Sequence, residues 1–141
     1  MDYLEEAKRI FKNDIFATET TGIEIEDAAK DYAKCSLKLG PKHMNALGTP
    51  MGGAIYTLAD FTFAVAANTG NMPTVTVTSE ITFLSRAKGS TITAEAMCTK
   101  DGERNCFFII DIKDELDTEV ATVTIHGYRK KTAAPGDTVR I

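Results

Sequence analysis

MGGAIYTLADFTFAVAAN, residues 51–68, is the longest apolar stretch of this 141-residue chain. Apolar side chains recur in it at helical spacing and also occupy the other faces, which predicts a helix buried nearly all round. Asn68-Thr69-Gly70 followed by Pro73 is a typical stop signal. We therefore expect a central helix over about residues 51–69.

Strand patterns flank this helix on both sides. Residues 32–39 alternate apolar and polar side chains, which is the period of a half-buried strand. Four long stretches rich in β-branched residues follow the helix and are separated by turn signals: 74–85, 90–100, 104–115 and 118–130. A long antiparallel sheet and one wholly apolar helix bury each other best if the sheet curls around the helix, so the predicted fold class is α+β.

The rest of the chain completes a single predicted domain over residues 1–141. An amphipathic pattern predicts a short helix over about residues 2–13, and the Thr-rich residues 15–25 are predicted to be extended. The tail, residues 132–141, is predicted to be loose.

Composition argues against several classes of function. The net charge is −4, and acidic and basic residues are mixed along the chain, which does not suit a nucleic-acid surface. The N-terminus has no apolar signal-peptide core and no stretch is suited to span a membrane, so we expect a cytoplasmic protein. Cys35, Cys98 and Cys106 lie in apolar or alternating runs, which favours buried reduced thiols over a catalytic cysteine. Two histidines, His43 and His126, are too few to suggest a metal site, and we expect no metal ion or redox cofactor.

Asp60 lies in the middle of the apolar stretch and is the only charged residue between His43 and Ser79. A carboxylate buried without partners would cost several kcal/mol. Three readings are open: the hydroxyl groups of Tyr56 or Thr57 satisfy the carboxylate, the helix turns it towards solvent, or it has a catalytic role.

The start of the predicted helix favours the catalytic reading. The first N–H groups of a helix have no intrahelical acceptors, and Gly52 and Gly53 have no side chains to keep a ligand away. A carbonyl oxygen placed there would meet N–H donors and the positive end of the helix, as in an oxyanion hole. Together with a basic carboxylate, such a site suits hydrolysis of an activated carbonyl group. A Gly-Gly pair is also compatible with a close-packed turn.

Residues 43–68, HMNALGTPMGGAIYTLADFTFAVAAN, resemble the signature of hotdog-fold acyl-CoA thioesterases of the phenylacetate-pathway (PaaI-like) type. That signature has His-x-Asn, a Gly, His-Gly-Gly, and then Leu-Ala-Asp in a helix of small residues. The likeness continues through TVTVTSEITFLSRAKG and ITAEAMCTKDGERNCFFIIDI and ends near Arg129. It implies a hotdog fold, in which an antiparallel sheet wraps a central helix, and hydrolysis of acyl-CoA or aryl-acyl-CoA to the free acid and coenzyme A.

The resemblance also implies roles for individual residues. Asp60 falls on the catalytic carboxylate, which acts as general base or as nucleophile, and Gly52 falls on the residue whose N–H polarises the thioester carbonyl. Asn45 falls on an asparagine near the thioester and water, and Thr76 on a hydroxyl residue that helps to place water. Further candidates for substrate contacts are Gly53, Met51, His43, Arg86 and Lys88, with Arg129, Lys130 and Lys131 as additional candidates for coenzyme A phosphates. A structural role is equally open for His43, solvated strand ends are equally open for these cations, and packing is favoured for His126.

Met51 departs from the family pattern, which commonly has His at this position. Methionine cannot donate the hydrogen bond that an imidazole donates. The departure makes a non-catalytic acyl-CoA binding protein the main alternative to a thioesterase. A hotdog hydratase or dehydratase is disfavoured because no His lies on the predicted helix. A structural dimer, with Asp60 as a polar interface residue, is the remaining alternative.

The spacing of Gly52 and Asp60 has a consequence that needs no family. Eight residues separate them, which is about 12 Å along one helix. One carbonyl oxygen cannot lie about 3 Å from that N–H while its carbon is within reach of the same chain's carboxylate. If both groups act on one thioester, they come from two chains, which predicts sites at a symmetric dimer interface. The resemblance implies homodimers or homotetramers. The acyl group stays undetermined, because the sequence does not place the side chains considered for the acyl tunnel: Phe61, Phe63, Met72 and Phe83.

Overall fold

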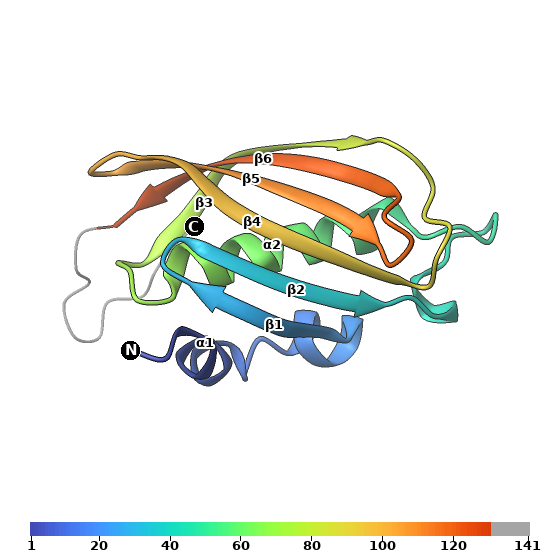
Figure 1. Ribbon diagram of the computed structural model, residues 1–141, viewed down its shortest axis with the longest axis horizontal. Coiled ribbons are helices and arrows are strands. Elements are labelled where there is room, and N and C mark those ends of the chain that lie inside the picture. Colours follow the sequence, from blue (N-terminus) through green and yellow to red (C-terminus); the bar gives the residue numbers. More distant parts are fainter. Residues whose placement is uncertain (131–141) are drawn as a thin grey trace.

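One antiparallel sheet and one long helix make up the body of the computed structural model, which describes residues 1–130 (Figure 1). The predicted tail, 132–141, and Lys131 lie outside the described residues. The six strands follow the order β1-β2-β4-β5-β6-β3. The strands are β1 (Ile23–Ala29), β2 (Tyr32–Lys38), β3 (Thr74–Phe83), β4 (Thr91–Asp101), β5 (Asn105–Asp114) and β6 (Glu119–Arg129). The helices are α1 (Tyr3–Phe11), the π-helix η1 (Phe16–Thr21), the 3₁₀ turn η2 (Pro41–His43) and α2 (Gly52–Asn68).

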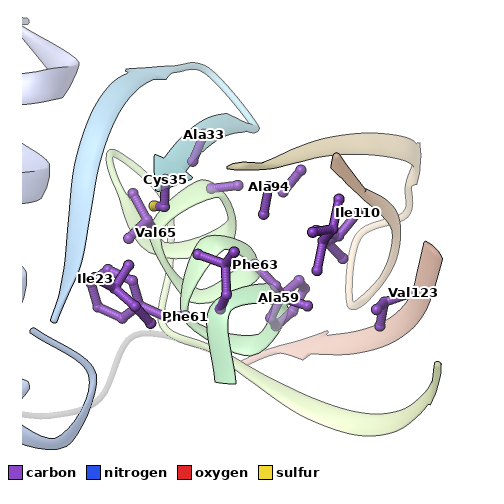
Figure 2. Packing of buried hydrophobic residues seen from close by; sticks show 14 of the residues in the cluster. Ile23, Ala33, Cys35, Ala59, Phe61, Phe63, Val65, Ala94, Ile110 and Val123 are labelled. Carbon is purple, nitrogen blue, oxygen red and sulfur yellow. The ribbon is translucent and has the colours of Figure 1, made fainter. Parts of the chain in front are cut away.

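The sheet curls around α2, as the sequence predicts (Figure 1). Alternate residues of the central strands are buried against the helix, for example Ala94 and Ala96 in β4 and Phe108 and Ile110 in β5. The small residues of β4 leave room for the bulky side chains of α2, and Phe63 packs edge-to-face on Phe108 with ring centroids 5.2 Å apart. Figure 2 shows buried side chains of α2 and of the sheet from close by, among them Phe63, Ala94 and Ile110. The hotdog arrangement and the five strands predicted over 32–39 and 74–130 are confirmed, with bounds that differ by one to two residues.

The N-terminal segment differs from prediction. Residues 15–25 were expected to be extended because they are rich in β-branched residues, yet residues 16–21 form the π-helix η1 and only then does β1 begin. The Thr18 hydroxyl donates to the Asp14 carbonyl oxygen at 2.8 Å, and Gly22, at a φ of 92°, ends the turn. A local side-chain bond and a left-handed glycine therefore outweigh the strand propensity of the threonines.

One face of α2 is open in the single chain. Gly53 and Asp60 are exposed, and Tyr56, Thr57 and Ala64 are only partly buried, while the other faces are packed against the sheet. Each of these five residues lies three or four positions from another of them, so they form one stripe along the helix. The prediction of burial nearly all round is therefore wrong for one chain.

The two edges of the sheet differ in how far they are covered by other parts of the chain. α1 lies beside β1, so that edge is partly covered (Figure 1). At the other edge β3 pairs with β6 on one side, and residues Val77 to Glu80 are exposed. None of the helices over residues 1–130 combines the length and the apolar character that a membrane span requires.

Candidate active site

The first turn of α2 presents free backbone donors. The helix begins at Gly52, and its N-cap residue, Met51, makes no side-chain capping bond. The N–H groups of Ala54 and Ile55 donate to the Met51 carbonyl oxygen at 2.9 and 3.3 Å. Among residues 1–130 no acceptor faces the N–H of Gly52 or of Gly53. The positive end of the helix dipole is therefore open at these two glycines.

Asn45 builds the loop that leads into α2. Its side-chain oxygen accepts from the N–H groups of Leu47 at 3.0 Å and Thr49 at 3.1 Å, and its amide nitrogen donates to the Thr49 hydroxyl at 2.8 Å. The second amide hydrogen of Asn45 has no acceptor in this network. The residue thus fixes the turn immediately before the helix start.

His43 ties this loop to η1. Its Nδ1 accepts from the Gly40 N–H at 2.9 Å, so Nε2 carries the proton and donates to the Thr21 carbonyl oxygen at 2.7 Å. The ring is buried, and both of its nitrogens are occupied. These contacts give His43 a structural role in this chain, because its ring holds the loop before α2 against η1.

Asp60 lies two turns further along the open stripe of α2. Within the described residues its carboxylate has no hydrogen-bond donor and no ion-pair partner, because Thr57 donates to the Gly53 carbonyl and Tyr56 bonds to Ser79. Although the side chain reaches the surface of the single chain, the protein around it removes much of its water. This desolvation raises the pKa of the Asp60 carboxyl, and the negative charge of Asp14 acts in the same direction.

Two pockets flank the start of α2. The larger, here called the η1 pocket, has a volume of about 450 Å³ and is lined by Phe16, Thr20, Thr21, Lys42, His43, Met51, Gly53, Ala54 and Thr57. The smaller, here called the β3–β4 pocket, has a volume of about 300 Å³ and is lined by Thr49, Pro50, Ile55, Phe83, Leu84, Ser85, Arg86 and Ala87. The ring of Phe83 lies over Gly52, where an added Cβ would be 3.0 Å from it.

The remaining candidates are spread over the molecule. Met51 is 57% exposed beside the free donors. Arg86 and Lys88 are exposed on the connection between β3 and β4, and Arg86 lines the β3–β4 pocket near the same helix end. Thr76 is half-buried in β3 opposite Gly127. The structure thus brings Asn45, Met51 and Arg86 to the start of α2, with Asp60 about 12 Å away along the helix.

Arg129 and His126 lie elsewhere. Arg129 is buried at the other end of α2, where it donates to the Ala67 carbonyl oxygen at 2.9 Å and pairs with Asp101 and Asp31. This internal use contradicts the reading of Arg129 as a phosphate contact or a solvated strand end. His126 stacks on Phe107 on the face of the sheet away from α2 and bonds to the Asn105 side chain at 2.7 Å.

The cysteines are unpaired, and Cys35 and Cys106 are buried. Burial raises the pKa of the Cys35 thiol to about 12, so it is not a nucleophile at neutral pH. Within residues 1–130 no three His, Cys, Asp or Glu side chains gather closely enough to hold a metal ion.

Sequence reasoning missed Asp14, Phe16 and Thr20 as neighbours of the site. Ring contact between Phe11 and Phe61, with centroids 5.5 Å apart, holds the end of α1 against α2 and so brings this segment to the open stripe. The FKND segment gives no sign of that contact, because it depends on tertiary packing.

The chain is similar to a known protein family and to a named relative. Residues 7–128 match the family described as "Domain of unknown function (DUF4442)". Acyl-coenzyme A thioesterase 13 of Mus musculus is 32% identical over 114 residues, which cover 79% of this chain and 81% of the relative.

Two solved structures share the fold. The PaaI protein from the phenylacetic acid degradation operon of E. coli superposes with a TM-score of 0.86 at 23% identity, covering 93% of this chain and 95% of that one. A hypothetical thioesterase from Streptococcus pneumoniae, solved with coenzyme A, has a TM-score of 0.79 at 21% identity, covering 88% and 99%. From the family match, the thioesterase relative and the shared fold, the chain belongs to the DUF4442 family and, with it, to the PaaI-like hotdog thioesterases.

Proposed function

We propose that this chain hydrolyses acyl-CoA or aryl-acyl-CoA thioesters to the free acid and coenzyme A. The observation that carries the proposal is that α2 has both an uncapped start at Gly52 and a carboxylate, Asp60, that has no hydrogen-bond or ion-pair partner among residues 1–130. The first supplies donors for a developing oxyanion, and the second supplies a base of raised pKa. The names of the relatives support the same substrate class.

The central groups of the proposed reaction are the Gly52 N–H, the Asp60 carboxylate and water. The thioester carbonyl oxygen accepts from the Gly52 N–H, which stabilises the negative charge that grows on it. The Asp60 carboxylate either takes a proton from the attacking water or attacks the carbonyl carbon itself. In the first case the C–S bond of the tetrahedral intermediate breaks, and the proton taken from water passes to the leaving thiolate of coenzyme A. In the second case the C–S bond breaks as a mixed anhydride forms between Asp60 and the acyl group. Water then hydrolyses this anhydride, which releases the free acid, restores the Asp60 carboxylate and supplies the proton of the coenzyme A thiol. The free amide hydrogen of Asn45 and the hydroxyl of Thr76 are the proposed partners of the carbonyl and of water. No metal ion or redox cofactor enters the scheme.

The two reacting groups come from different chains in this proposal. Gly52 and Asp60 lie on one unbroken helix, about 12 Å apart along its axis. A second copy related by a two-fold axis can bring its Asp60 to the first chain's Gly52, and the reverse, which gives two sites per dimer. The open stripe of α2 and the exposed edge of β3 offer surfaces for such a homodimer, which can pair again as a homotetramer.

Met51 favours one other function, an acyl-CoA binding protein without turnover. At the position where the family commonly has His, Met51 lies exposed beside the free donors and offers no N–H of its own. Such a protein would bind acyl-CoA saturably and release no thiol.

Thiol release distinguishes these two functions. Purified protein is incubated with acetyl-, octanoyl-, palmitoyl- and phenylacetyl-CoA, and free thiol is followed with DTNB. Catalytic release with at least one substrate is expected. Binding of acyl-CoA by calorimetry, with no release from any of the four, would establish the binding protein instead.

Met51→His is expected to be tolerated and to raise the hydrolysis rate or change the acyl preference. The side chain is exposed, so an imidazole fits without repacking, and it adds a hydrogen-bond donor beside Gly52. kcat and KM are measured for the four substrates, with Met51→Leu as a control that has similar volume and no donor. If both variants behave like the wild type, Met51 has a packing role alone.

Asp14→Asn is expected to move the acidic limb of the kcat/KM profile to lower pH. Asp60 acts as base or nucleophile only when it is ionised, and the charge of Asp14 adds to the desolvation that holds its pKa above the ordinary value. Removal of that charge lowers the pKa of Asp60, so activity persists further into acid. Glu19→Gln, which removes an exposed carboxylate on η1, is the matched control and should leave the limb in place. An unmoved limb in Asp14→Asn would separate Asp14 from the titration of Asp60.

A further inference from the structure

Tyr56 is the one large side chain on the open stripe of α2. The other members of the stripe are Gly53, Thr57, Asp60 and Ala64, and Tyr56 lies between the two exposed ones, Gly53 and Asp60. Its ring is only partly buried, so part of it faces solvent in the single chain. Tyrosine often anchors the centre of a protein–protein interface, because its ring offers a large contact area at a low cost in side-chain entropy. Tyr56 therefore decides how closely a second helix can approach this stripe.

A hydrogen bond connects Tyr56 to the open edge of the sheet. Its hydroxyl oxygen and that of Ser79 lie 2.5 Å apart. Ser79 belongs to residues 77–80, the exposed run on the edge strand β3. The unpaired backbone groups of an edge strand are suited to pair with another chain. The bond thus joins the middle of the open stripe to the open edge, so a partner centred at this point covers both surfaces.

The proposed shared site places the two-fold axis of the dimer without reference to these surfaces. Gly52 of each chain meets Asp60 of the other chain, so the two copies of α2 run antiparallel across the axis. In such a pair of helices, the residue midway between two partners lies at the axis. Tyr56 is four residues from Gly52 and four from Asp60. The geometry of the reaction, the open stripe and the open edge of β3 therefore share one centre, at Tyr56 and Ser79.

We propose that the two copies of Tyr56 meet at the two-fold axis of a homodimer and that Tyr56 acts there as a positioning residue for both active sites. The bond to Ser79 holds each ring in place, and the two rings set the distance between the helices. That distance decides how near Asp60 of one chain comes to a thioester bound at Gly52 of the other. Tyr56 lies about 6 Å from either group along α2, so it places these groups and does not itself react. This inference rests on the proposed function and adds a residue to it.

Thr57→Cys tests the position of the axis and leaves Tyr56 unchanged. Thr57 follows Tyr56 on the stripe, so its two copies are offset by about 3 Å along the helices. Packed helices have axes about 8–10 Å apart, which brings facing Cα atoms near the range that a disulfide spans. Oxidation with diamide is expected to convert most of this variant into a covalent dimer on a non-reducing gel. The wild type, treated in the same way, gives the background from the native cysteines.

Ala64→Cys is the matched control for cross-linking. Ala64 lies on the same stripe, but its two copies are about 24 Å apart along the helices, so this variant should stay monomeric on the gel. Circular dichroism confirms that both variants fold, and Tyr56→Cys replaces Thr57→Cys if the latter does not. A covalent dimer from Ala64→Cys alone, or from neither variant, would overturn the proposed axis.

Tyr56→Phe tests the positioning role, because it keeps the ring and removes the hydroxyl that bonds to Ser79. We expect kcat for octanoyl-CoA to fall by about tenfold or more with little change in KM, since small displacements of reacting groups are costly. Ser79→Ala breaks the same bond and should cause the same loss, with no further loss in the double variant. The matched control is Tyr32→Phe, which removes a hydroxyl bonded to Glu95 at 2.8 Å and should keep the wild-type kcat. A purely structural role would lower the melting temperature of Tyr56→Phe and leave its kcat unchanged, which would refute the proposal.

Failure of the proposed function and failure of this inference give different results. If the wild type releases no thiol from any acyl-CoA, the proposed function has failed, whereas the cross-linking of Thr57→Cys still reports the axis. The role of Tyr56 is then measured as the rate of that cross-linking in the Tyr56→Ala background. The rate should fall by about tenfold or more, because the central contact between the chains is lost. An unchanged rate would show that Tyr56 does not set the approach of the two helices.

Discussion

Replacement of Asp60 by Asn is expected to lower kcat for acyl-CoA hydrolysis by about 100-fold or more, because an amide acts neither as base nor as nucleophile. The substitution is nearly isosteric, and the carboxylate has no hydrogen-bond partner within the described chain that an amide would lose. The loss should therefore fall on kcat with little change in KM. Steady-state thiol release with octanoyl-CoA measures both constants.

The same variant should be as stable as the wild type at neutral pH, or more stable. The pKa of Asp60 is raised in the folded protein, chiefly by desolvation, so the folded state holds its proton to higher pH than the unfolded state does. Wild-type stability therefore falls as pH rises from about 4, the ordinary value, through the raised pKa. The Asn variant lacks this loss, so its melting temperature at pH 7 should equal or exceed that of the wild type.

A surface carboxylate provides the control for Asp60→Asn. Glu24→Gln removes a charge from the exposed side of β1 and should hydrolyse octanoyl-CoA at close to the wild-type rate. If Asp60→Asn stays within a few-fold of the wild type, Asp60 has no part in the reaction. If it is inactive and also melts well below the wild type, its inactivity reflects lost folding.

Local pattern predicts the framework of this protein. The apolar stretch and its Asn-Thr-Gly stop predict a helix over about 51–69, and the helix spans Gly52–Asn68. Period-2 alternation predicts β2, and stretches rich in β-branched residues between turn signals predict the four later strands. The same reasoning fails at η1, since a helical turn that depends on one Thr18 bond and on Gly22 leaves no periodic signal.

Part of the candidate site can also be predicted from the sequence, through helix geometry and not through the hydrophobic pattern. The free donors at Gly52 follow from the predicted helix start, the two glycines leave them accessible, and the separation from Asp60 follows from helix geometry. What surrounds them comes from distant segments. The Phe11–Phe61 contact brings Asp14 to Asp60, and the His43–Thr21 bond joins two of the residues that line the η1 pocket. Such contacts join residues more than twenty positions apart and leave no local pattern.

The open stripe of α2 connects the fold to the proposed site. Sequence reasoning expects burial on all faces because the stretch is apolar all round, whereas the single chain leaves Gly53 and Asp60 exposed. The expected burial and the exposure in the single chain are both explained if a second chain covers this stripe. The covering chain would then supply the carboxylate that the first chain's Gly52 lacks.

Gly52→Pro provides the partner variant for a test of the shared site. Proline removes the backbone N–H, and it is tolerated at the first position of a helix. Met51, the residue before it, has a ψ of 136°, which suits a residue that precedes proline. Gly52→Ala is the matched control, because it adds a Cβ beside the Phe83 ring and keeps the N–H, so it should retain far more activity than Gly52→Pro.

Mixing two inactive variants is expected to restore about a quarter of the wild-type activity. Asp60→Asn and Gly52→Pro should each be nearly inactive, since every site in either homodimer lacks one group. Co-refolding of equal amounts makes about half of the dimers mixed, and each mixed dimer has one site with both defects and one site with neither. Circular dichroism confirms that each variant folds, and a tagged copy of one variant confirms that mixed dimers form. If Gly52 and Asp60 served the same site from one chain, every site would keep one defect. Mixed dimers that form and stay inactive would therefore rule out the shared site.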